Sequence, residues 1–99
     1  MYESNLVGIA TRATGTGLRV VTSANANIIG VLCAASATAT GGMQLFAGVT
    51  SSVSITGLIV FASGSVAQYV PLPVYASGGI TMNVGAAANP DITLFWNPA

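Results

Sequence analysis

Short runs of alternating apolar and polar residues recur along this chain. In ITMNV, Ile80, Met82 and Val84 share one face of an extended chain, and Thr81 and Asn83 share the other. This period of two residues is typical of a β-strand with one buried face. Three further runs alternate in the same way, at residues 18–23, 43–48 and 91–96.

Two other runs, IIGVLCA at 28–34 and TGLIVFA at 56–62, are apolar on both faces. Such runs predict central strands covered on each side, or strands that contact a neighbouring subunit. The runs at 6–11 and 66–70 add two more candidates, which gives about eight strands. No segment carries a helical apolar stripe with recognisable caps.

Clusters of Gly, Ser, Asn and Pro separate these runs at short intervals. This spacing predicts an all-β fold in which two antiparallel sheets pack face to face about 10 Å apart. Because 99 residues suit one domain with a modest core, we expect a single β-sandwich over residues 1–99. The chain start is interpreted as a first strand with a loose connection, because Leu6, Val7 and Ile9 have apolar bulk to bury. A flexible arm, limited to residues 1–5, is the alternative.

The chain has very few charged side chains, which affects what its surface can do. Glu3, Arg12, Arg19 and Asp91 are the only acidic or basic side chains, and residues 20–90 carry none, whereas an ordinary domain is about a quarter charged. A neutral surface of Ser, Thr, Asn and Gly provides no repulsion between copies. The composition therefore predicts that other protein covers much of the surface, in an oligomer or a lattice. The alternative is a small soluble domain with an unusually neutral surface.

Several function classes are disfavoured. The chain contains no histidine, and no serine lies in a catalytic motif, so we predict no enzyme activity and no cofactor or metal. Two basic residues do not make a nucleic-acid-binding patch. No apolar run reaches the roughly 20 residues of a membrane-spanning helix, and the acidic start does not match a signal peptide. Cys33 is the only cysteine and is interpreted as a small buried hydrophobe.

The stretch YVPLPVY places Pro71 and Pro73 inside an apolar run. Proline cannot donate a backbone hydrogen bond, and two prolines at this spacing remove donors from the same side of an extended strand. The pattern predicts an edge strand that is blocked against further pairing. The alternative is a proline-rich crossover between the sheets.

Three aromatic residues allow one further interpretation. Tyr69, Tyr75 and Trp96 could form a stacking platform for sugar, as in a carbohydrate-binding module. The alternative is that these rings pack in the core or at a subunit interface.

The chain also resembles a family of viral proteins. The succession QLFAG, GLIVFASG, YVPLPVYASGGITMNV and ITLFW is similar to small all-β structural proteins of tailed bacteriophages, including jelly-roll capsid decoration, or cement, proteins. The resemblance spans roughly residues 18–96. It implies a non-enzymatic virion protein that binds the major capsid protein on the outer surface of an icosahedral head, commonly as a homotrimer, and stabilises the shell. Head-fibre, tail and host-recognition components are the alternatives.

Two groups of residues are the candidates for contacts in such an assembly. We predict that Arg12 and Arg19 meet an acidic surface of the shell, the alternative being two solvated charges. The predicted contacts between subunits are large apolar residues of the two-faced runs: Ile28, Ile29, Leu58, Val60 and Phe61.

Overall fold

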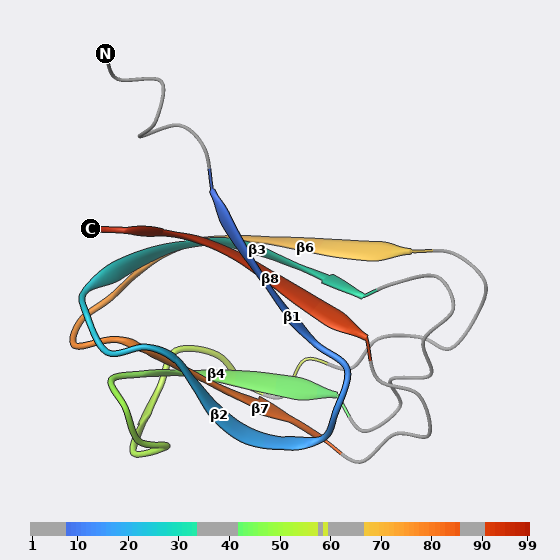
Figure 1. Ribbon diagram of the computed structural model, residues 1–99, viewed down its shortest axis with the longest axis horizontal. Helices are drawn as coiled ribbons and strands as arrows, with labels where there is room; N and C mark the ends of the chain where they lie inside the picture. The colour runs from blue at the N-terminus through green and yellow to red at the C-terminus, as the bar shows by residue number, and fades with distance from the viewer. Residues whose placement is uncertain (1–7, 34–41, 58, 60–66, 86–90) are drawn as a thin grey trace.

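In the part of the chain that the structure describes, eight antiparallel strands form two four-stranded sheets (Figure 1). The computed structural model describes residues 8–33, 42–57, 59, 67–85 and 91–99. Their strands are β1 (Ile9–Ala13), β2 (Gly17–Thr22), β3 (Ala26–Cys33), β4 (Met43–Ala47), β5 (Val53–Ser54), β6 (Gln68–Ala76), β7 (Ile80–Val84) and β8 (Ile92–Pro98). The alternative of an arm at residues 1–5 lies outside these ranges.

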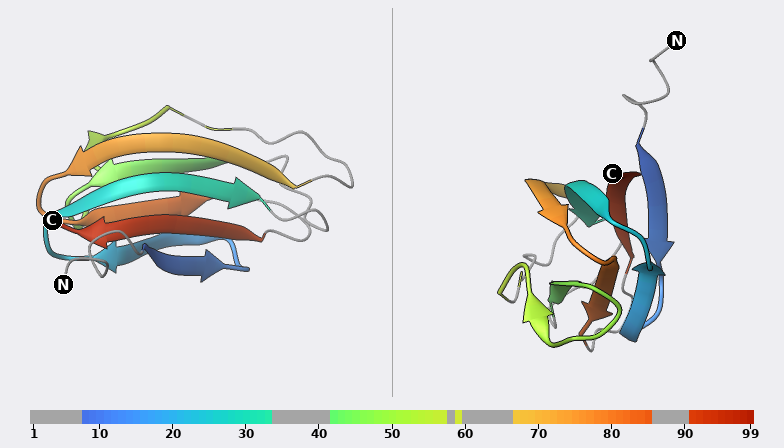
Figure 2. Two further views of the ribbon diagram at one scale, coloured as in Figure 1. Left: turned by 90° about the horizontal axis from the view of Figure 1, so that it is seen from above. Right: turned by 90° about the vertical axis from the view of Figure 1, so that its left-hand side faces the viewer.

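The order of strands is that of a jelly roll. The first sheet runs β1-β8-β3-β6 and the second runs β2-β7-β4-β5. The strands therefore pair as β1 with β8, β2 with β7, β3 with β6 and β4 with β5. This is the pairing of one long hairpin wrapped around a barrel-like core. Figure 2 shows the two sheets as stacked layers. The predicted all-β, jelly-roll-like sandwich is confirmed.

The core lies between the sheets and follows the alternation seen in the sequence. Ile80, Met82 and Val84 of β7 are buried, as are Leu94 and Trp96 of β8. β3 is buried along most of its length because it lies between β8 and β6. One apolar face of β3 packs in the core, whereas Ile29 and Leu32 on the other face are only partly buried.

The second two-faced run is only partly described. Ile59 exchanges backbone hydrogen bonds of 2.8 and 2.7 Å with Met43. The strand predicted over 56–62 otherwise lies mostly outside the described residues. The outer edge of β4 thus pairs with the short β5 at Phe46 and Ala47 and with Ile59 at Met43.

Two loops pack tightly at one end of the sandwich. The backbone N–H of Gly78 donates to Asn25 Oδ1 at 2.7 Å, and Gly79 has a φ of +125°. A Cβ at Gly79 would collide with the carbonyl oxygen of Thr22 and lie 3.1 Å from Ser23 Cα. Both obstacles are backbone atoms, so a side chain cannot be accommodated by rotation.

Replacing Gly79 by alanine should therefore lower the free energy of unfolding by about 1–3 kcal/mol. Gly57→Ala is the matched control, because nothing lies within 4 Å of its Cβ position. Urea unfolding followed by circular dichroism measures both variants. Equal stabilities for the two would contradict the close loop packing.

Candidate functional site

The first sheet presents an apolar face to solvent. Along β6 the outward residues Tyr69, Pro71, Pro73 and Tyr75 are all exposed. On the neighbouring strands Ile29, Leu32 and Phe95 are only partly buried. We call the surface formed by these seven residues the outer apolar face.

A hollow of about 490 Å³ lies on this face. It is lined by Gly8, Ile29, Leu32, Tyr69 and Phe95, so residues of β3, β6 and β8 meet there. The rings of Tyr69 and Phe95 stand edge to face, with centroids 6.2 Å apart and planes at 62°. Such a hollow offers apolar contact together with one phenolic hydroxyl.

Gly30 makes room for the Tyr69 ring. A Cβ at Gly30 would collide with the Tyr69 hydroxyl and ring, so the tyrosine ring lies over the glycine. The pairing register of β3 shifts between Ile28 and Gly30 against both of its neighbours. Glycine at an irregular position inside a strand is typical of such a close approach.

The predicted subunit contacts separate in the structure. Ile28 is 2% exposed and belongs to the core, so the prediction that it contacts a neighbouring subunit is wrong. Its side chain is needed between the sheets. Ile29 lies on the outer apolar face and lines the hollow. Leu58, Val60 and Phe61 lie outside the described residues.

No protein family, curated protein or solved structure that was compared with this chain matches it.

Arg12 forms an ion pair within the chain. Its Nε and Nη2 donate to the two carboxylate oxygens of Asp91, each at 2.8 Å. The hydrogen bond from Arg12 lowers the pKa of Asp91 below its usual range, against a smaller opposing effect of desolvation. The same bond raises the pKa of Arg12. The Arg12 side chain is 66% exposed, but its charge is already balanced. Contact with an acidic shell surface stays a prediction.

This ion pair predicts how stability depends on pH. The pKa of Asp91 is lower in the folded chain, so the pair stabilises the fold above the unfolded value of about 3.9 and loses this effect as acid protonates the carboxylate. We expect the midpoint temperature of thermal unfolding to decrease as the pH is lowered from 6 to 3. The decrease should be smaller in Asp91→Asn. Fluorescence of Trp96, the only tryptophan, reports unfolding. Identical acid slopes in both proteins would contradict the role of the pair.

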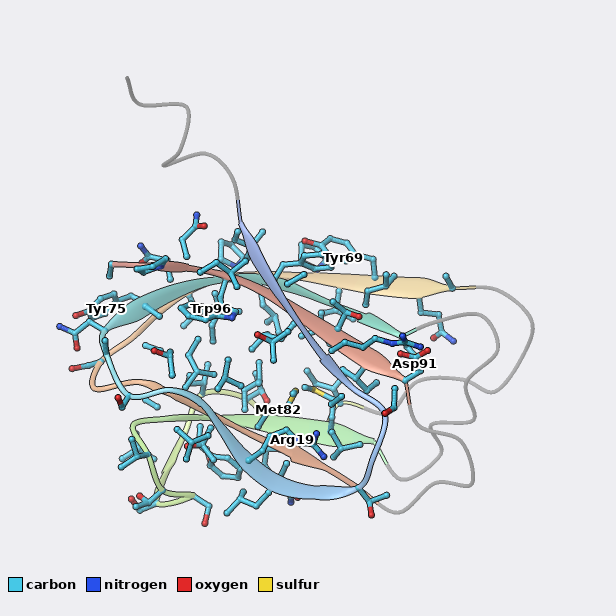
Figure 3. The ribbon with its side chains drawn as sticks, in the orientation of Figure 1. Arg19, Tyr69, Tyr75, Met82, Asp91 and Trp96 are labelled. Carbon is cyan, nitrogen blue, oxygen red and sulfur yellow. The ribbon has the colours of Figure 1, made fainter. Side chains whose placement is uncertain are left out.

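Arg19 has a different setting. It faces the space between the sheets, near Met82 (Figure 3). Its Nη2 donates to the carbonyl oxygen of Gly15 at 2.7 Å, whereas its Nε is buried and has no hydrogen-bond partner among the described residues. The two arginines are therefore not equivalent candidates for shell contact, because only Arg12 is well exposed.

The three-ring sugar platform is not formed. Trp96 is 9% exposed and packs in the core, where its Nε1 donates to Thr11 Oγ1 at 3.0 Å. Tyr69 and Tyr75 face solvent, at 49% and 54% exposed. Figure 3 shows Trp96 between the layers and Tyr69 on the opposite side of the first sheet. The ring that does accompany Tyr69 is Phe95, which no sequence pattern indicates.

The described residues contain little other chemistry. Cys33 is 3% exposed, and burial, with a smaller effect of the Asp91 charge, raises its thiol pKa. Its interpretation as a buried hydrophobe agrees with this position. Among the described residues, no three His, Cys, Asp or Glu side chains gather in a way that could hold a metal ion, and none of them forms a helix long and apolar enough to cross a membrane.

Proposed function

We propose that this chain is a non-enzymatic structural protein of a phage virion, a decoration or cement protein that binds the outer surface of the head. The observation that carries the proposal is the outer apolar face on a jelly-roll sandwich with almost no surface charge. Such a face favours association with other protein. Its partners would be the major capsid protein and further copies of this chain.

Exposed apolar side chains on both sheets support several contacts at once. In addition to Tyr69 and Tyr75, Leu18 and Val20 of β2 are 56% and 52% exposed, and Val53 of β5 is 58% exposed. Contacts on more than one side let weak interactions add up in a lattice. A protein that binds only the assembled shell stabilises it by mass action.

The proposal is tested with capsids that carry or lack the chain. Decorated shells should withstand higher temperature and stronger osmotic shock. Tyr75→Ser should reduce occupancy of the shell, whereas Thr14→Ser, at an exposed polar residue outside the outer apolar face, should leave it unchanged. Equal robustness of decorated and bare shells would remove the cement function. Immunogold labelling of virions then distinguishes a head location from a fibre or tail location.

A carbohydrate-binding module is the second candidate. It is favoured by the hollow, where the half-exposed Tyr69 ring meets Phe95 beside a phenolic hydroxyl. Aromatic rings that combine an apolar face with a polar tip suit the faces of sugars. A glycan array tests this function. Clear retention of one polysaccharide, abolished by Tyr69→Ala, would favour it over the structural function.

A further inference from the structure

The four edges of the sandwich fall on two sides. β6 and β5 lie at one side, and β1 and β2 lie at the other (Figure 2). An edge strand offers unpaired backbone N–H and C=O groups to any other strand. The four edge strands differ in the features that prevent or permit such pairing.

Three edges carry features that disfavour strand addition. β6 contains Pro71 and Pro73, and β5 has only two residues. β2 directs Arg19 inward, with a buried Nε that has no hydrogen-bond partner in the part of the chain that the structure describes. A strand added beside β2 would enclose this cation further. Prolines, short strands and inward-pointing charges all protect sheet edges.

β1 differs from the other three. It has five residues and no proline, and its charged residue, Arg12, is neutralised by Asp91. Within the part of the chain that the structure describes, β1 pairs with β8 alone. Ile9 and Ala10 are exposed on this strand. The outer edge of β1 is thus available to accept a strand.

We propose that β1 pairs antiparallel with β1 of a second copy, around a twofold axis at Thr11. This register aligns all five residues and places Ala10 opposite Arg12 of the second copy. The small, exposed Ala10 leaves space for the long arginine. A register centred on Arg12 would place like charges opposite each other, which is unfavourable. The two first sheets would become one continuous sheet. This twofold contact does not depend on the proposed function.

Two substitutions at Ala10 test this register, because they should change the dimer affinity in opposite directions. Ala10→Glu places a carboxylate opposite Arg12 of the second copy, and Ala10→Lys places a second cation there. Because the contact occurs twice, dimer affinity should rise roughly two- to thirtyfold with glutamate and fall by a similar factor with lysine. Sedimentation equilibrium at low salt measures both. Ser54→Glu and Ser54→Lys on exposed β5 are the controls and should leave affinity unchanged.

Amide hydrogen exchange on the unmodified chain gives a second measurement. Exchange in residues 9–13 should slow as concentration rises, while exchange in β2 stays constant. A monomer at every soluble concentration would overturn the proposal. It would also be overturned by a dimer or trimer whose affinity shifts in the same direction with glutamate and lysine. Failure of capsid binding alone would leave this contact intact, because its test needs no shell.

Discussion

Replacing Leu94 by alanine should lower the free energy of unfolding by about 2–5 kcal/mol. Leu94 is fully buried in β8, a central strand of the first sheet. Truncation removes apolar contacts and leaves a cavity between two sheets that cannot collapse freely. For a domain with a typical stability of about 5–15 kcal/mol, this is a large fraction of the total.

Leu18→Ala is the matched control for this experiment. It removes the same atoms from β2, but Leu18 is 56% exposed and should change stability by less than about 0.5 kcal/mol. Urea unfolding followed by far-ultraviolet circular dichroism compares the two variants. If Leu18→Ala were as damaging as Leu94→Ala, the inward and outward faces of β2 or β8 would be wrongly assigned.

Period-two alternation was sufficient to predict the buried faces of β7 and β8. The two apolar faces of the 28–34 run likewise predicted a central strand, which is β3. These predictions succeed because the pattern of apolar and polar residues depends only on whether a strand has one solvent-exposed face or none. Which strands pair is decided by contacts between distant segments. Alternation therefore did not predict that 53–54 would form the outer strand beside β4.

β2 shows where alternation alone is ambiguous. Its residues separate into Leu18 and Val20 on one face and Arg19 and Val21 on the other. Burial of apolar bulk favours the first pair as the inner face, yet the structure exposes Leu18 and Val20 and turns Arg19 inward. At a sheet edge the inner face opens toward solvent, so a long cation can reach there and bond to Gly15.

The candidate site could be predicted only in part. The sequence indicates Tyr69 and Tyr75 as candidates, but the residues that surround them depend on which strands become neighbours. Phe95 and Tyr69 lie on β8 and β6, which are both neighbours of β3. Their rings can meet across β3 because it has glycine at position 30. A glycine inside an otherwise apolar run is the signal that could have indicated this close approach. Ile28 and Ile29, adjacent in sequence, have different environments because successive residues of a strand point to opposite faces of the sheet.

The largest expected effect on association follows from Pro71 and Pro73. Both lie within β6, an edge strand of the first sheet, so the edge-strand prediction is confirmed and the crossover alternative is wrong. Their blocking role stays a prediction. Replacing both by threonine restores two backbone donors while adding polar rather than apolar side chains. Aggregation should increase severalfold with the fold retained, because a nine-residue edge would become able to template further strands.

Thioflavin fluorescence and light scattering during incubation near the unfolding midpoint measure this effect, and circular dichroism verifies the fold. Pro98→Thr is the matched control, because Pro98 is the last residue of β8 and pairs with Ala26 of β3, a central strand of the sheet. Threonine there changes composition without freeing an edge. If the Pro71/Pro73 variant lost stability but stayed as soluble as the control, the prolines would fix the strand conformation and nothing more. If it aggregated while Ala10→Lys suppressed only the reversible dimer, β6 and β1 would have opposite roles: one edge closed to strands, the other open to a single copy.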